Sequence, residues 1–282
     1  MRVPGGRAWH HCRVLPVDAV LSIASSFGID ASEPVTLSDS NNVVLWLRPA
    51  PVVAKVATGH HHSLALELAV GKHLATLDAP AVPPAGELPR RVHQCGDFEV
   101  TFWTYQTHHQ GEADPHQLGQ ALFQLHAAMR TFRDALPSFL NGLSAVDELL
   151  RHPGRVPDLP ERDRVLLLSA LARLSQELAH IGAGTHPLHG SPHDANTLVT
   201  DGGIRFVDFE TACLGPIEWD LAHVSAETVS DYPGTYDPDA LATCRALVSV
   251  KTAAWCWANF GHPSLRWHAK HHLSVVRRLM AH

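Results

Sequence analysis

One short run of the chain brings together residue types that can do chemistry. The run is LHGSPHDANTLV, residues 188–199, in which an apolar stretch follows the polar part at once. Within eight positions it contains His189, Gly190, Ser191, His193, Asp194 and Asn196. Imidazole, hydroxyl, carboxylate and amide groups gathered this closely are typical of a catalytic or binding loop rather than of an ordinary surface loop.

A second feature is a pair of polar residues at the two ends of a predicted β-hairpin. The segment NTLVTDGGIRFVDFE has two apolar runs around a turn at Asp201-Gly202-Gly203. A hairpin folds its ends together, so Asn196 and Asp208, twelve residues apart, are expected to converge. Amide and carboxylate oxygens suit a hard ion such as Mg²⁺, with substrate phosphates supplying the remaining ligands.

A third feature is a charge inside an apolar strand. Lys55 lies within VVAKVA, and burial of a lysine is costly unless the ammonium is paired. Glu67, twelve residues later on a predicted helix, is the obvious partner. A lysine held by a helical glutamate is the arrangement that clamps nucleotide phosphates in kinases.

The elements that must position these residues follow from the apolar periodicity and the turn residues. Two strands with a turn are predicted in residues 34–57, and another strand in 97–106. Ser63 can cap the first helix, Asp114 or Pro115 starts the second, and a glycine ends the third. Helices are predicted at 63–76, 114–132, 161–182, 238–259 and 264–280. The pattern predicts an α+β fold in which a strand-rich part joins a helix-rich part near residue 106.

Composition excludes several classes of protein. The chain has 282 residues, 45% of them hydrophobic, with a net charge of −6 and no Lys/Arg run, which argues against a nucleic-acid partner. Five cysteines without a C-x-x-C pair favour a reduced, cytoplasmic protein without a zinc ribbon. None of the 22 histidines has metalloprotease spacing. No signal peptide or membrane-spanning run is evident, so no membrane partner is expected.

Taken in order, these pieces resemble the aminoglycoside phosphotransferase family of small-molecule kinases, relatives of the protein kinases. The matching segments are VVAKVA, LALELAVG, LHGSPHDAN and VDFETACLGPIEWDLAHV. The phrase GPIEWDLA is the most specific, because it resembles the family's tail after the metal-binding carboxylate. The resemblance covers residues 34–230 by motif, and the whole chain by length and lobe order.

The resemblance implies a bilobal protein-kinase-like fold that uses ATP and Mg²⁺, with GTP left open as the nucleotide. The small antiparallel sheet of residues 1–105 would bind nucleotide, and the mainly helical lobe of residues 106–282 would carry the catalytic loop and the acceptor. Lys55 would contact the phosphates, with Glu67 orienting it. A glycine-free turn would cover the phosphates, made of Ser38, Asp39, Ser40, Asn41 and Asn42.

The resemblance also implies roles near the hinge and in the catalytic loop. Main-chain groups around Thr104 and Tyr105 would bind adenine. Asn196 and Asp208 would hold Mg²⁺, and Asp220 would brace the catalytic loop against His189.

The sequence departs from the family at Ser191, where the family has an aspartate that accepts the proton of the acceptor hydroxyl. A serine is no useful base at neutral pH without a partner, and such assistance is commonly worth about 10²–10⁴-fold. Three interpretations stay open. Asp194 or His193 replaces the base, or Ser191 only positions an acceptor that loses its proton easily, such as an amine or an acidic hydroxyl. Alternatively, the protein is a nucleotide-binding pseudokinase or regulatory module.

The acceptor itself is less defined. Acidic residues of the second half make a cationic small molecule, such as an amino sugar or aminoglycoside, one hypothesis. They are Glu210, Glu218, Glu227, Asp231, Asp237 and Asp239. A purely structural or interaction protein is the remaining class, and the sequence does not indicate an oligomeric state.

Overall fold

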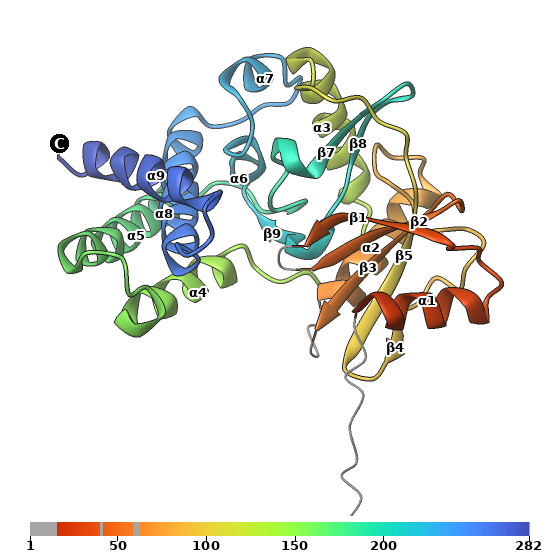
Figure 1. The fold of residues 1–282 in the computed structure, drawn as a ribbon. Coiled ribbons are helices and arrows are strands. Elements are labelled where there is room, and N and C mark those ends of the chain that lie inside the picture. Colours follow the sequence, from red (N-terminus) through yellow and green to blue (C-terminus); the bar gives the residue numbers. More distant parts are fainter. Residues whose placement is uncertain (1–15, 40–41, 59–62, 282) are drawn as a thin grey trace, which may run out of the picture. The chain divides into compact units, whose positions relative to one another are not determined.

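The protein forms two compact units along the chain. The computed structural model describes residues 16–39, 42–58 and 63–281 (Figure 1). One unit contains residues 1–68 and 83–106, and the other contains residues 69–82 and 107–282. The assignment of nucleotide binding to residues 1–105 and of acceptor binding to residues 106–282 stays a prediction.

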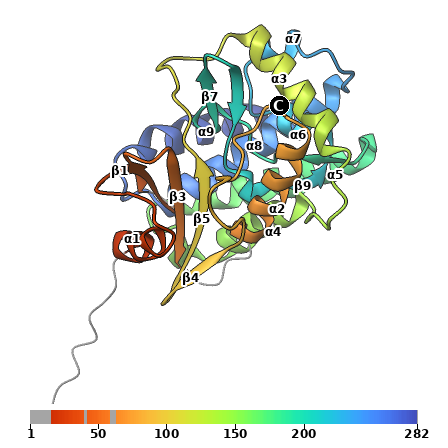
Figure 2. The same ribbon diagram turned by 90° about the vertical axis from the view of Figure 1, so that its right-hand side faces the viewer.

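The first unit is built on a five-stranded antiparallel sheet in the order β1-β2-β3-β5-β4 (Figure 2). Its strands are β1 Glu33–Asp39, β2 Val43–Arg48, β3 Val52–Thr58, β4 His93–Cys95 and β5 Phe98–Thr104. Helix α1 Pro16–Ser26 buries Val20 and Ala24 in the same core as Leu45, Leu47 and Val100. The predicted mixed α+β architecture with a small antiparallel sheet is therefore confirmed.

The prediction of two strands in residues 34–57 was incomplete, because the structure has three strands there. The additional strand, β1, pairs on one side only and has exposed side chains at six of its seven positions. Pro34 also fits an edge strand, since proline cannot donate to a neighbouring strand. A strand without an apolar face gives no period-two signal, so the sequence pattern did not reveal it.

Helix α2 Ser63–Thr76 matches the predicted helix and runs from the first unit into the second. It buries Leu64, Leu68, Val70 and Leu74. The side chain of Ser63, the predicted N-cap, lies outside the described part of the structure.

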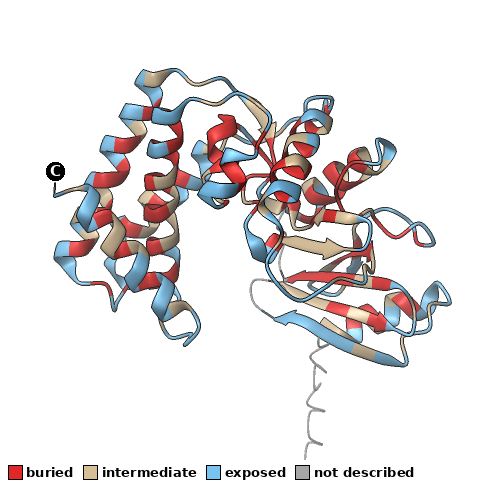
Figure 3. Ribbon diagram, turned by 90° about the horizontal axis from the view of Figure 1, so that it is seen from above, coloured by how far each residue is buried: buried red, intermediate tan, exposed pale blue. Residues whose placement is uncertain are grey.

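The second unit is mainly helical. Its helices are α3 Pro115–Met129, α4 Leu140–Arg151, α5 Glu161–Ile181, α6 Ile217–Leu221, α7 Ala226–Ser230, α8 Pro238–Ala258 and α9 Leu265–Leu279, with 3₁₀ turns at Pro153–Arg155, Asp194–Asn196 and Phe209–Thr211. Asp114 caps α3 by accepting the Gln117 N–H at 3.0 Å, and Gly182 ends α5 in a left-handed conformation, as predicted. Figure 3 shows buried and exposed segments alternating along these helices, which is the mark of amphipathic packing.

Two short antiparallel pairs of strands position the loops of this unit. Strand β6 His186–Leu188 pairs with β9 Cys213–Gly215, and the predicted hairpin forms from β7 Thr197–Thr200 and β8 Gly203–Phe206. The run LHGSPHDAN therefore leaves β6 and enters β7, and the segment after β8 returns to β9. Among the described residues, no helix is both long enough and apolar enough to cross a membrane.

Candidate active site

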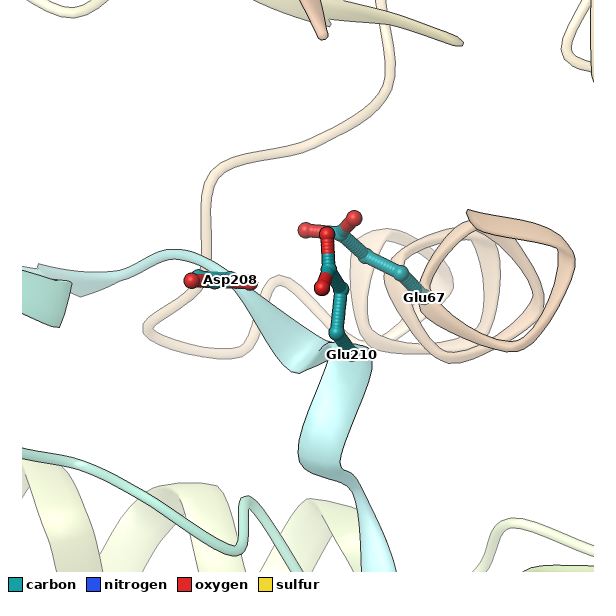
Figure 4. Close-up of side chains that lie close together, drawn as sticks. All are labelled: Glu67, Asp208 and Glu210. Atoms are coloured by element: carbon teal, nitrogen blue, oxygen red, sulfur yellow. The ribbon is translucent and has the colours of Figure 1, made fainter. Parts of the chain in front are cut away.

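The predicted partnership between Lys55 and Glu67 is present in the first unit. Lys55 Nζ lies 2.9 Å from Glu67 Oε2, and the two residues are only 7% and 3% exposed. Lys55 lies between Val44 and Thr101 in the register of the sheet, and Glu67 extends from α2 (Figure 4). Both charges lose their hydration on burial, and this cost offsets much of their attraction. The pair therefore adds little to the free energy of unfolding, and its more probative feature is that it fixes the position of the Lys55 ammonium.

The predicted phosphate-covering turn is described only at its margins. Strands β1 and β2 pair as far as Asp39 and Val43, with a bulge between Thr36 and Ser38. Ser40 and Asn41, the central residues of that prediction, lie outside the described residues. Their role in covering phosphates is a proposal that rests on the sequence.

The main-chain N–H groups of the predicted hinge, at Thr104 and Tyr105, already donate hydrogen bonds within the first unit. The Thr104 N–H donates to the carbonyl of Pro83 at 3.0 Å, and the Tyr105 N–H donates to the carbonyl of Pro51 at 2.8 Å. These N–H groups are already engaged, so a main-chain contact to adenine at these residues would have to use a carbonyl oxygen. The Tyr105 ring stacks on Trp46, with centroids 3.8 Å apart and planes 6° apart.

In the second unit, Asp220 holds the start of the loop of residues 189–196; that this loop is catalytic stays a prediction. Its Oδ2 accepts the backbone N–H of His189 at 2.9 Å and its Oδ1 accepts that of Gly190 at 2.8 Å, so the contact uses the loop backbone. Asp220 is fully buried. Burial opposes ionisation, but the hydrogen bond from His126 and the nearby imidazoles keep the pKa of Asp220 below its usual value.

Sequence reasoning missed two residues behind this carboxylate. His126 Nε2 donates to Asp220 Oδ2 at 3.0 Å, and the Tyr232 hydroxyl lies 2.9 Å from His126 Nδ1. With the ring proton on Nε2, Nδ1 accepts a hydrogen bond from the Tyr232 hydroxyl. The available signal was a histidine on the apolar face of α3, four residues after the buried Leu122.

The His189 ring serves the loop backbone. Its Nε2 donates to the Val207 carbonyl at 2.9 Å, and its Nδ1 accepts the Ser191 N–H at 3.4 Å. Burial lowers the pKa of His189, so the neutral ring with its proton on Nε2 fits both contacts. The ring thereby joins the loop to the strand end that precedes Asp208.

Gly190 is required by the path of the loop. Its φ of +88° is unfavourable for other residues, and a Cβ there would collide with the carbonyl oxygen of Thr211. Its own carbonyl accepts the Trp219 Nε1–H at 3.0 Å. The loop backbone is therefore fixed on both sides of position 190.

The two predicted metal ligands lie at the ends of the hairpin. The Asn196 carbonyl accepts the Val207 N–H at 3.0 Å, which holds Asn196 beside the residue that precedes Asp208. Asn196 Nδ2 donates to the Ser191 carbonyl at 3.0 Å, which orients the amide and leaves Oδ1 for a cation. Asp208 has the left-handed conformation, with φ of 65°.

The structure adds Glu210 to this donor set. A carboxylate oxygen of Glu210 lies within 4.8 Å of one of Asp208, and both come from the turn after β8 (Figure 4). The sequence places Glu210 among the acidic residues considered for an acceptor, although it is also the last residue of the D-F-E motif. One amide and two carboxylates are hard oxygen donors, and this set fits Mg²⁺.

Ser191, His193 and Asp194 differ in their surroundings. Ser191 is partly buried, and its carbonyl accepts the His193 N–H at 2.9 Å. His193 and Asp194 are exposed, with Asp194 starting a 3₁₀ turn. Among the described residues, no hydrogen bond joins the Ser191 hydroxyl to either side chain, so neither activates it here.

Comparison with known proteins defines the class to which this fold and site belong. Solved structures of small-molecule kinases share the fold at low sequence identity. A choline/ethanolamine kinase family protein from Mesorhizobium loti is 17% identical, with 88% of each chain covered and a TM-score of 0.67. The aminoglycoside phosphotransferase APH(3'')-Id from Streptomyces rimosus is 20% identical over 84% of this chain and 99% of that one, with a TM-score of 0.63.

A third solved structure with the same fold is also a choline kinase. The choline kinase LicA from Streptococcus pneumoniae is 12% identical over 93% of this chain and 99% of that chain, with a TM-score of 0.68. No curated protein sequence matches the chain. The model of the phosphotransferase enzyme family matches residues 33–267. The chain therefore belongs to the phosphotransferase enzyme family, which confirms the resemblance drawn from its motifs.

Proposed function

We propose that this protein transfers the γ-phosphoryl group of ATP to a hydroxyl of a small molecule, with Mg²⁺ as cofactor. The observation that carries the proposal is the pair of neighbouring carboxylates Asp208 and Glu210, which follows a hairpin whose other end is Asn196, beside a braced loop. Bound Mg²⁺ would neutralise phosphate charge and align the transferred group. A structural protein has no need for such a set.

Each group of the chain has a defined part in the proposal. Lys55, oriented by Glu67, would offset charge on the α- and β-phosphates. Asn196, Asp208 and Glu210 would hold the metal, and Asp220 would keep the loop backbone in place through His189 and Gly190. Phosphoryl transfer passes through a loose transition state, so most of the rate enhancement would come from positioning and electrostatics.

The proton of the acceptor hydroxyl needs a separate destination, because Ser191 cannot take it unaided. Asp194 and His193 are the candidates from sequence. Without any such group the protein would be a pseudokinase that binds nucleotide and transfers slowly or not at all. The exposure of His193 and Asp194 is the observation that keeps this second function open.

The acceptor class is not fixed by the acidic residues of the second unit. Glu218 is buried and accepts the Asp237 N–H at 2.7 Å, while Asp237 caps α8. These two carboxylates therefore serve the backbone. The solved relatives include a choline kinase and an aminoglycoside phosphotransferase in complex with streptomycin, so a cationic acceptor such as an amino sugar stays one candidate among small hydroxyl compounds.

The test is an acceptor-library screen with ATP and Mg²⁺, run in parallel on wild type and Asp208→Ala. A kinase phosphorylates at least one hydroxyl compound, and Asp208→Ala lowers that turnover by at least ~10²-fold. Nucleotide binding without transfer to any compound supports the pseudokinase. Turnover that survives Asp208→Ala unchanged contradicts the metal assignment.

A further inference from the structure

Lys251 is a charged residue within an otherwise apolar part of helix α8. Its helical neighbours Leu247, Val250 and Ala254 are fully buried, and Lys251 itself is partly buried. Within the described ranges, no hydrogen bond or salt bridge is made by its ammonium group. An ammonium without a direct hydrogen bond or ion pair on a packed helix is costly, which calls for a function.

The amine of Lys251 lies close to the catalytic loop of the same unit. Its Nζ is 5.4 Å from the centroid of the Trp219 ring, and Trp219 donates to the Gly190 carbonyl on the loop. The charge of Lys251 also acts electrostatically on His193. Ser191 lies between Gly190 and His193, so both sides of position 191 are linked to Lys251.

None of the titratable groups around Lys251 forms a hydrogen bond or a salt bridge with it in the described part of the structure. Electrostatic interactions connect it to Cys213, Asp220, His193 and His223. Asp220 is already bound by two backbone N–H groups and by His126. Burial raises the pKa of the Cys213 thiol to about 12, so the thiol is uncharged at neutral pH.

The neighbouring histidine is uncharged as well. Burial, with the Lys251 charge adding to it, lowers the pKa of His223 to about 3. Burial also lowers the pKa of Lys251 itself, which favours the neutral amine. A neutral lysine amine is a proton acceptor, and desolvated lysines serve as general bases for this reason.

Resting on the proposed phosphotransfer, we propose that Lys251 accepts the proton of the acceptor hydroxyl beside Ser191. The acceptor oxygen forms a bond to the γ-phosphorus as the bond from that phosphorus to the bridging β–γ oxygen breaks, and ADP leaves. The hydroxyl proton passes to Lys251 Nζ, giving an ammonium that later releases it to water. Lys251 then takes the part that the carboxylate at position 191 has in the family.

Lys251 suits this part better than Asp194. Asp194 is exposed and begins a 3₁₀ turn, where water competes for its carboxylate. Lys251 instead lies over the Trp219 ring on a buried face of α8, where the loss of hydration favours the neutral amine and outweighs the nearby charge of Asp220.

The first experiment measures the protonation of Lys251 without any acceptor. Competitive labelling of the whole protein with acetic anhydride across pH, read by mass spectrometry, reports where each lysine becomes a free amine. Lys270, exposed on α9, is the internal reference. We expect the midpoint of Lys251 at clearly lower pH than that of Lys270. Coincident midpoints would overturn the proposal, whatever the fate of the kinase assignment.

The second experiment compares variants with the best acceptor from the screen. Lys251→Met should lower kcat by about 10²–10⁴-fold with the KM for ATP unchanged, while Lys270→Met leaves both unchanged. Lys251→Arg carries a permanent charge and cannot accept a proton, so its kcat should stay low. Adding Ser191→Asp to Lys251→Met should restore part of the lost rate. Melting curves show whether each variant is folded.

Several results would contradict the inference. Near-normal kcat in Lys251→Arg would assign Lys251 to charge, as an anchor for an anionic acceptor, and full activity in folded Lys251→Met would remove it from the reaction. If the wild-type protein phosphorylates no acceptor, the proposed function fails. If it is a kinase but the labelling midpoint of Lys251 equals that of Lys270, only the inference on Lys251 fails.

Discussion

The carboxylate of Asp220 accepts three hydrogen bonds, from two loop N–H groups and from the His126 ring. Its folded pKa lies below the usual value, so its stabilising contribution is present above the unfolded pKa and disappears as pH falls through the folded pKa. This single side chain thus couples the position of the loop of residues 189–196 to its own ionisation.

Replacement of Asp220 by Asn therefore removes more than a charge. The amide has one acceptor oxygen and turns an NH₂ toward existing donors. We expect the free energy of unfolding of Asp220→Asn to fall by about 3–5 kcal/mol, as for other broken buried ionic contacts. Chemical denaturation at neutral pH measures this change, with the exposed Asp134→Asn as control. A loss under about 1 kcal/mol would contradict the bracing role.

His223 gives the protein a second dependence on pH. Its pKa is about 3 when folded, against about 6.5 in an unfolded chain, so the unfolded state binds the proton first. The free energy of unfolding should fall by a few kcal/mol between about pH 6.5 and pH 3. His223→Gln should flatten this slope in denaturation curves across pH, whereas His180→Gln on the exposed side of α5 should not. Equal slopes in all three proteins would refute the effect.

At the scale of elements, the Lys55–Glu67 pair joins strand β3 to helix α2 in a buried place. Lys55→Met leaves a buried carboxylate, and we expect a loss of about 3–5 kcal/mol in the free energy of unfolding. Lys55→Met with Glu67→Met should recover much of that stability without recovering nucleotide affinity. Denaturation and nucleotide titration of both variants measure the two effects. Recovery of nucleotide affinity in the double variant would show that the pair is structural only.

Sequence patterns revealed the elements that carry a strong apolar face. The helices around Leu122, Leu171 and Leu247 have such faces and were predicted within a few residues of their ends. The exposed strand β1 was missed because it has no buried face. Helix α4 was missed although Leu143, Val146 and Leu150 are buried at helical spacing, and Gly142 in its first turn weakened the pattern.

The residues of the candidate site also differ in how far the sequence could predict their contacts. Residues close in sequence, such as Asn196 and Asp208, could be predicted because one hairpin brings them together. Three other segments supply the remaining contacts, and only tertiary packing forms them. His126 contacts Asp220, Tyr232 contacts His126, and Lys251 lies over the Trp219 ring. No spacing in the sequence encodes those contacts.

At the scale of the whole molecule, the match to the phosphotransferase enzyme family covers residues 33–267, and so includes both units. The groups assigned to the phosphates belong to the first unit, and those assigned to metal and acceptor belong to the second. Ser191 limits only the fate of a proton, because the groups proposed for metal and phosphate do not include it.

Calorimetric titration of the full chain with ATP, with and without Mg²⁺, tests the central claim most directly. We predict Mg²⁺-dependent binding with a dissociation constant below a millimolar, and at least tenfold weaker binding in Asp208→Ala, a loss of about 1.4 kcal/mol or more. Absence of binding to wild type at millimolar nucleotide would contradict both the kinase and the pseudokinase.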